Sequence, residues 1–243
     1  MEDILKELSF LILELVKKFK WIIKVSKVEK IIALIVLILA FAGMVISRID
    51  MTFYEAVFVK EDFIIEWLTV LALLAGAYLC FYRVVILRKS KAPLFLIATL
   101  VLGLLFVFGA GEEISWGQRL LGIKSPEFFM KHNTQYEMNF HNLMLNGVRI
   151  NKLIFGLLLT IIILFYFLVL PVLFRKIEKI RNLANSLALP IPRVSHVFLY
   201  LVLGGIVLLI PSSKKGEILE FGGCWIFFIM ILNPFNKSNF FKA

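Results

Sequence analysis

Two short stretches of this 243-residue chain combine residue types that do chemistry, and the first is G-E-E-I-S-W-G-Q-R at residues 111–119. Glu112, Ser115 and Arg119 follow one another at spacings of three and four, so a helix that continues through them places all three on one face. Adjacent carboxylates in a poorly hydrated place, such as Glu112 and Glu113, are a common source of a general base or a proton carrier. The alternative interpretation is a solvated helix end with an ordinary Glu–Arg ion pair.

The second stretch, residues 133–142, is densely polar on one side. Its amide, acid and histidine side chains occupy every second position, but Asn133, Glu137 and His141 also stand four apart and would stack on one helical face. A lone strand at a bilayer surface needs a pairing partner, so we expect a helix or a packed irregular segment. Glu137 and His141 could supply two ligands to a divalent metal, although a lone histidine is more often a hydrogen-bonded structural residue.

Further acids stand at the ends of apolar runs, where they are expected to reach the same membrane face. Glu66 lies near one end of the second run, and Glu217 and Glu220 lie near one end of the sixth. Carboxylates within apolar spans are costly, so they usually face the interior of a bundle and mark function. The alternative is that some of them pair with nearby surface cations, which are Arg119, Arg149, Lys214 and Lys215.

From these patterns we predict one polar site, to which four separate chain segments contribute residues. The candidate catalytic residues are Glu112, Glu113, Arg119, Glu137 and His141. The candidate substrate-binding residues are Glu66, Ser115, Trp116, Gln118, Asn133, Gln135, Asn139, Asn142, Glu217 and Glu220. The candidate metal ligands are Glu137 and His141. Arg119 could hold a phosphate, and one of the acids could serve as a general base.

The elements that must position these residues are transmembrane helices. The chain is 60% apolar and 18% charged, with a mean hydropathy of +0.91, whereas soluble domains are about 45–50% apolar and about 25% charged. This composition excludes disordered, collagenous and disulfide-rich proteins and disfavours soluble ones. We predict an all-α, polytopic transmembrane helix bundle that forms one membrane domain over residues 28–236. Its six spans are expected near residues 31–46, 63–85, 94–109, 153–174, 194–210 and 218–232.

Lysine and arginine set the orientation of these spans. Eighteen of the 27 fall on the side that holds both termini and nine on the other, so both termini are predicted to be cytoplasmic and residues 110–152 extracytoplasmic. The net charge of +10 is then explained by loops that face anionic lipid, and no nucleic-acid partner is expected. Cys80 and Cys224 fall inside apolar runs at different depths, so we interpret both as packing residues.

Two amphipathic segments are predicted outside the spans. Residues 1–27 place apolar side chains at helical spacing among lysines, which fits a helix lying in the cytoplasmic interface or one docked on the other spans or on a second subunit. Ser125-Pro126-Glu127 has the pattern of an N-cap, a first-turn proline and an acidic first turn, and predicts a short amphipathic helix. The partners expected are therefore membrane lipid and a homo-oligomer or membrane partner protein.

The two polar stretches, G-E-E-I-S-W-G-Q-R and N-x-Q-x-E-x-N-x-H-N, resemble the signature of an uncharacterised family of bacterial multi-pass membrane proteins. The resemblance covers residues 109–143 and implies a bacterial cytoplasmic (inner) membrane location without naming a reaction. A looser likeness is to the intramembrane CAAX-type proteases, in which paired glutamates precede an arginine and later helices supply two histidines. Arg119 stands six residues after Glu113, two more than that pattern asks, and only His141 is near.

Three functions fit the sequence. The first is an enzyme, a hydrolase or transferase, that acts on a lipid or lipid-linked substrate in the outer leaflet. The second is an ion or proton-coupled transporter or channel, in which Glu66 and Glu220 handle protons or cations. The third is a non-catalytic membrane effector or subunit held to a partner by its N-terminal helix.

Overall fold

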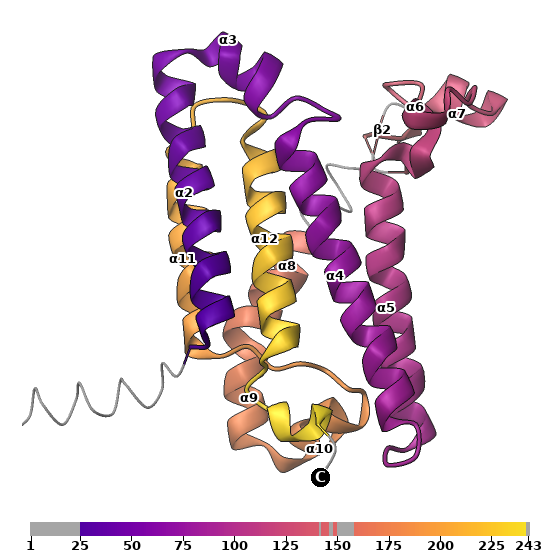
Figure 1. The fold of residues 1–243 in the computed structure, drawn as a ribbon, viewed down its shortest axis with the longest axis vertical. Helices are drawn as coiled ribbons and strands as arrows, with labels where there is room; N and C mark the ends of the chain where they lie inside the picture. Colours follow the sequence, from indigo (N-terminus) through magenta and orange to yellow (C-terminus); the bar gives the residue numbers. More distant parts are fainter. Residues whose placement is uncertain (1–24, 141, 146–147, 150–157, 242–243) are drawn as a thin grey trace, which may run out of the picture.

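The described part of the chain folds into a bundle of six upright helical segments (Figure 1). The computed structural model describes residues 25–140, 142–145, 148–149 and 158–241. The upright segments are α2 (Lys27–Ile49), α4 (Ile64–Leu87), α5 (Pro93–Glu113), the continuous run of α8 (Leu159–Leu164), η4 (Phe165–Val169) and α9 (Leu170–Lys176), α11 (Val194–Leu208) and α12 (Lys215–Leu232). Each coincides with a predicted span to within a few residues where it is described.

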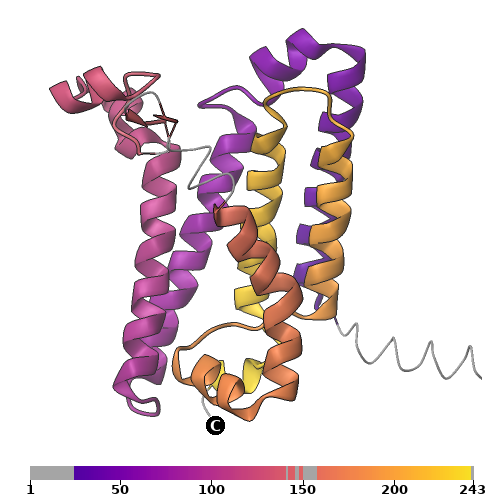
Figure 2. The same ribbon diagram turned by 180° about the vertical axis from the view of Figure 1, so that it is seen from behind.

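Shorter elements close the two ends of the bundle. At the end where α4 begins, α5 ends and α12 begins lie α3 (Met51–Phe53), η1 (Tyr54–Phe58), η2 (Ser115–Gly117), α6 (Gln118–Leu121), α7 (Glu127–His132), β1 (Met144–Leu145) and β2 (Val148–Arg149). We call this the motif end. At the opposite end lie α10 (Glu178–Ser186) and η5 (Lys237–Phe240), with the C-terminus (Figure 2).

Local sequence explains where several helices begin. Ser26 and Glu29 form a capping box at the start of α2, in which Ser26 Oγ accepts from the Glu29 amide at 3.2 Å and Glu29 Oε2 accepts from the Ser26 amide at 2.7 Å. Pro93 occupies the first turn of α5, where its missing N–H costs nothing. The predicted helix after Ser125 is present as α7, but Pro126 is its N-cap residue and no side chain caps it.

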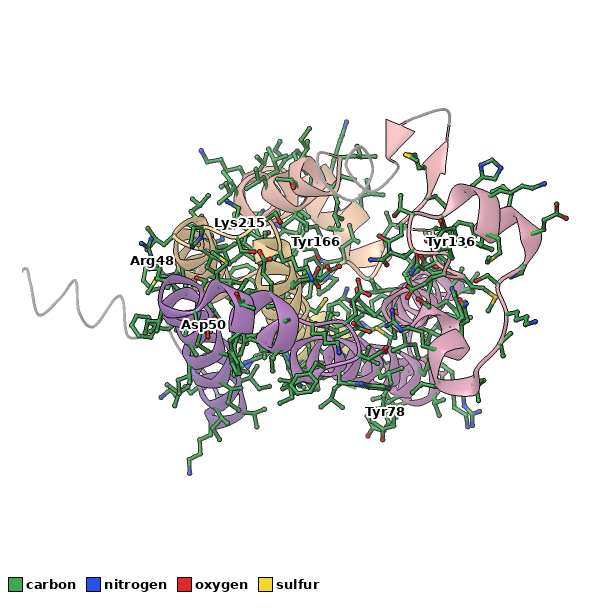
Figure 3. All side chains as sticks on the ribbon, turned by 90° about the horizontal axis from the view of Figure 1, so that it is seen from above. Arg48, Asp50, Tyr78, Tyr136, Tyr166 and Lys215 are labelled. Atoms are coloured by element: carbon green, nitrogen blue, oxygen red, sulfur yellow. The ribbon has the colours of Figure 1, made fainter. Side chains whose placement is uncertain are left out.

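The surface of the bundle is that of a membrane protein. In the described part of the chain, four helices are long and apolar enough to cross a bilayer: α2, α4, α5 and the run Leu159–Lys176. Large apolar side chains on them face outward, including Ile38, Leu71 and Leu104, and Tyr78 points away from the bundle (Figure 3). An exposed apolar surface of this extent is typical of a protein whose helices contact lipid. The predicted N-terminal helix falls almost entirely outside the described residues.

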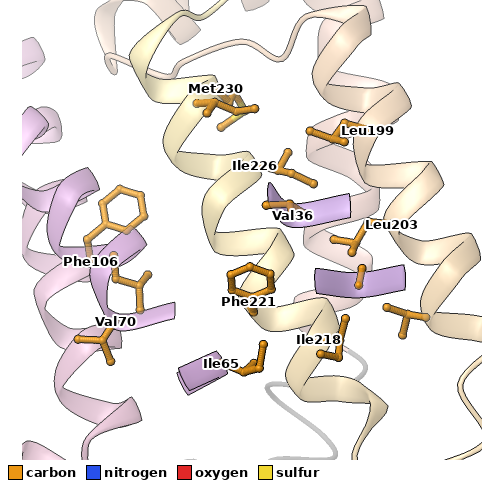
Figure 4. Close-up of a cluster of buried hydrophobic side chains, with 14 of the residues drawn as sticks. Val36, Ile65, Val70, Phe106, Leu199, Leu203, Ile218, Phe221, Ile226 and Met230 are labelled. Carbon is orange, nitrogen blue, oxygen red and sulfur yellow. The ribbon is translucent and has the colours of Figure 1, made fainter. Parts of the chain in front are cut away.

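Helix α12 lies at the centre of the bundle and packs against α2, α4 and α11. Its side chains Ile218, Phe221, Ile226 and Met230 are fully buried. Figure 4 shows them in one apolar cluster with Leu199 and Leu203 of α11. Because α12 is surrounded by helices, its first turns can carry acids toward the interior of the motif end rather than toward lipid.

Candidate functional site

The end of α5 differs from the helix that the spacing of Glu112, Ser115 and Arg119 predicts. The helix stops at Glu113 because the next residues take left-handed backbone angles, with φ of 47° at Ser115, 54° at Trp116 and 77° at Gly117. Two consecutive non-glycine residues in this region cost about 1–3 kcal/mol each. The prediction of one continuous helical face is therefore wrong.

Contacts with the end of α5 and with the polar loop around Phe140 hold this turn. Trp116 folds back so that its Nε1 donates to Glu112 Oε1 at 2.9 Å, and its ring lies over Gly111, where a Cβ would come within 2.9 Å of it. Glu112 Oε2 accepts from the amide of Phe140 at 2.6 Å. Glu112 is thus buried and bound to the loop rather than paired with Arg119.

Arg119, on α6, is the hub of an acidic cluster at the motif end. Its Nη1 donates to Glu137 Oε1 and its Nη2 to Glu66 Oε1, both at 2.7 Å. Its Nε lies 2.8 Å from Asp62 Oδ2, an ion pair that is not aligned as a hydrogen bond. Burial lowers the pKa of Arg119, but the Glu137 hydrogen bond and the surrounding carboxylates outweigh it, so the pKa lies above its ordinary value. With these donors committed to carboxylates, the geometry gives no support to the phosphate-holding role.

Glu137 is anchored from both of its oxygens. Oε1 accepts from Arg119, and Oε2 accepts from Ser115 Oγ at 2.7 Å and Asn139 Nδ2 at 2.9 Å. Ser115 and Asn139 are themselves buried and hydrogen-bonded to each other at 2.9 Å. The strained turn therefore delivers the Ser115 hydroxyl to a carboxylate that is buried 22 residues later in the chain.

The described part of the polar stretch, residues 133–140 and 142, is a packed irregular loop, one of the two forms expected, and not a helix. Asn133 organises it: Nδ2 donates to the carbonyl and Oδ1 of Asn139, while Oδ1 accepts from the amides of Gln135 and Glu137. Gln118 joins the loop to α6, since its Oε1 accepts from the amide of Met138 at 2.7 Å. The remaining amides are also engaged, with Gln135 donating to Glu61 and Asn142 to Gln135. The amide side chains thus hold the loop on Arg119 and α5.

A second group of acids lies beside this cluster, on the bundle side. Glu220, Glu217 and Glu66 all lie close enough to Glu113 to act on it electrostatically. Carboxylates this close to one another repel when both are ionised. Three helices, α4, α5 and α12, thus bring their acids together, and Glu66 is near both groups because it is also paired with Arg119.

Glu220 also lines an apolar cavity of about 450 Å³ between α5, α8, α11 and α12. Its walls include Phe106, Ile163, Tyr200 and Phe227. Glu220 is exposed to the cavity, whereas Glu113 is half-buried and does not line it. The volume falls in the range of roughly 300–1,000 Å³ that is typical of ligand pockets. An acid on the wall of such a cavity is the group of the motif end that is best placed to take part in a reaction.

Sequence reasoning missed several polar residues. Asp62 and Glu61 bind Arg119, and the signal that could have found them is their place four and five residues before Glu66 at the mouth of the second span. At the opposite end, Glu29 and His196 form a buried pair, with Glu29 Oε1 3.1 Å from His196 Nε2. The signal that could have found this pair is the single histidine in the apolar run of residues 194–210.

Among the described residues, no group of three or more His, Cys, Asp or Glu side chains could hold a metal ion. His141, the second predicted metal ligand, lies outside the described residues, so that prediction stays open. Cys80 is buried, Cys224 is partly buried, and both are free. No protein-family model, curated protein or solved structure matches the chain.

Proposed function

We propose that this chain is an integral membrane enzyme, a hydrolase or transferase, in which the Glu113–Glu220 pair acts on a lipid or lipid-linked substrate. The observation that carries the proposal is that Glu220 lines an apolar cavity among the helices, with Glu113 close to it. Two neighbouring carboxyls can divide the roles of acid and base between them.

The pair can perform hydrolysis with a balanced set of proton transfers. The ionised carboxyl takes a proton from water as the water oxygen bonds to the electrophilic centre of the substrate. The protonated carboxyl gives its proton to the departing oxygen as the bond to that oxygen breaks. The pair ends with one proton, as it began. In a transferase the hydroxyl of an acceptor replaces water in the same sequence.

The Arg119 cluster serves this centre as a scaffold. Arg119 holds Glu66 and Glu137, and it also approaches the Glu113 carbonyl through Nη2 at 3.4 Å. The loop thereby closes the motif end over the last turn of α5 (Figure 3). Within the proposal the chain has six spans in a bacterial inner membrane, both termini in the cytoplasm and the motif end outside, as the distribution of lysine and arginine favours.

The test is lipid turnover by the full-length chain in vesicles of bacterial polar lipid extract, followed by mass spectrometry of the lipids. General acid–base groups contribute about 10²–10⁴-fold to rate, so Glu113→Gln and Glu220→Gln should each reduce turnover at least about 100-fold. Glu127→Gln is the matched control, because Glu127 is paired only on the surface of α7 in the described structure. Lipids left unchanged by the wild type, or full activity in both glutamine variants, would refute the proposal.

The transporter hypothesis draws on a different observation. The buried Glu29–His196 pair places titratable groups at the opposite end of the bundle from Glu113 and Glu220. No acid or histidine stands between these two levels in the described spans, so a proton path would have to rely on water. Proton or cation flux into proteoliposomes that depends on both Glu220 and His196 would favour transport over catalysis.

A further inference from the structure

The cavity beside Glu220 extends along α12, and we refer to it as the channel. On α12 its lining runs from Gly216 through Gly223 to Phe227, on one face of the helix. At 1.5 Å rise per residue this stretch is about 16 Å long. A volume of about 450 Å³ along that length can hold a hydrocarbon chain.

The glycines on this face create the room. A Cβ added at Gly216 would meet nothing within 4 Å, and one at Gly223 would meet only the Tyr200 ring, at 3.9 Å. Both positions therefore border open space rather than a packed neighbour. An empty apolar channel of this size within a bundle is the kind of space that a ligand fills.

The charge at the head of the channel selects the ligand. Among the described residues, Glu220 is the one acid that lines the channel and is exposed to it, and Glu113 lies close behind. The neighbouring Glu66 is already paired with Arg119 at 2.7 Å. A cationic group at the head of the channel would complement the pair, whereas a phosphate placed there would be repelled.

We propose that the channel binds one hydrocarbon chain of an amine-bearing lipid, with the ammonium group seated against the Glu113–Glu220 pair. This inference rests on the proposed function, for which it names the class of substrate. The chain contacts Phe106, Tyr200 and Phe227, and the ammonium replaces water in donating hydrogen bonds to Glu220. In a phosphatidylethanolamine the phosphate stands between the hydrocarbon chain and the amine, so the headgroup folds to place its ammonium on Glu220 and its phosphate toward Lys214 and Lys215 at the start of α12.

The experiment measures binding without catalysis. Full-length protein in detergent is titrated with lysophosphatidylethanolamine and with lysophosphatidylglycerol of the same acyl chain, and the bound lipid is counted by native mass spectrometry. A charge-assisted hydrogen bond supports a preference of at least about 10-fold for the amine lipid. Glu220→Gln should abolish the preference, and Gly223→Leu should block binding of both lipids by filling the channel.

Gly204→Leu is the matched control, because Gly204 on α11 also borders open space but does not line the channel. Equal binding of the two lipids by the wild type, or binding unaffected by Gly223→Leu, would overturn the inference. The outcomes separate the two proposals. An amine preference without turnover refutes the enzyme and leaves the binding site, whereas turnover without the preference refutes the lipid class alone.

Discussion

Replacing Arg119 with methionine tests whether the acidic cluster is the scaffold of the motif end. The variant keeps most of the side-chain volume and removes the charge, so Glu66 and Glu137 lose their cation while staying largely buried, at 9% and 8% exposed. Removing one partner of a buried ion pair costs about 3–5 kcal/mol. Because a fifth of the Arg119 side chain is exposed, we expect the lower end, about 3 kcal/mol.

The contacts of Arg119 with Asp62 and Glu61 add little to this figure. Their side chains are 41% and 50% exposed, and exposed pairs are worth about 0–1 kcal/mol. The assay is equilibrium unfolding in mixed micelles with increasing sodium dodecyl sulfate, followed by helical circular dichroism. Lys131→Met is the control, since it removes only the exposed pair with Glu127 and should cost below about 0.5 kcal/mol.

A double-mutant cycle separates the Glu137 contact from the rest. Glu137→Gln alone leaves the Arg119 guanidinium with Glu66 and Asp62, while the double variant Arg119→Met, Glu137→Gln removes both charges of the pair. Residues in direct contact in one network couple by about 0.5–3 kcal/mol. A change in stability for Arg119→Met no larger than that for Lys131→Met, or a coupling near zero, would refute the view of Arg119 as a structural hub.

Three further variants test other parts of the motif end. Gly111→Ala should destabilise the protein by about 1–3 kcal/mol in the same unfolding assay, because its Cβ would lie 2.9 Å from the Trp116 ring, whereas Gly204→Ala should cost nothing. Asn133→Ala should cost about 2–4 kcal/mol by leaving buried amides unpaired, with faster hydrogen exchange of the loop as its signature; unchanged exchange would contradict this. Burial, followed by the charges of Glu217 and Glu55, raises the pKa of Tyr54 to about 12. Since the unfolded value is about 10, stability present below pH 10 is lost as the pH rises toward 12; Tyr54→Phe should escape that loss, and equal alkaline sensitivity of the two proteins would contradict the assignment.

The helical bundle was within reach of the sequence because apolar run length alone fixes where a helix can sit in lipid. The predicted span 63–85 is α4 over Ile64–Leu87, and the predicted span 94–109 is α5 over Pro93–Glu113. The extra turn at the end of α5, residues 110–113, consists of small and acidic residues, and hydropathy cannot count it. The number of crossings depends on short helices such as α11, which composition and length do not settle.

The geometry of the polar residues was out of reach because it depends on contacts between distant segments. Left-handed angles at Ser115 and Trp116 run against intrinsic preference and persist only through partners such as Glu137. The Glu29–His196 pair joins residues 167 positions apart, which no local spacing reveals. Periodicity in the loop was ambiguous because its amides follow a turn organised by Asn133 rather than a helix or a strand.

The division of the motif end into a scaffold and a reactive pair follows from where each charge is neutralised. Glu66 and Glu137 share one guanidinium and are largely buried, so each already has a cationic partner and is poorly placed to meet a ligand. Glu113 and Glu220 lie close to each other, and Glu220 lines the cavity. Glu66 links the two groups, since it binds Arg119 and acts electrostatically on Glu113. Loss of Arg119 should therefore impair both stability and lipid turnover, whereas Glu220→Gln should impair turnover and leave stability close to that of the wild type. This asymmetry distinguishes a reactive carboxyl pair from a purely structural one.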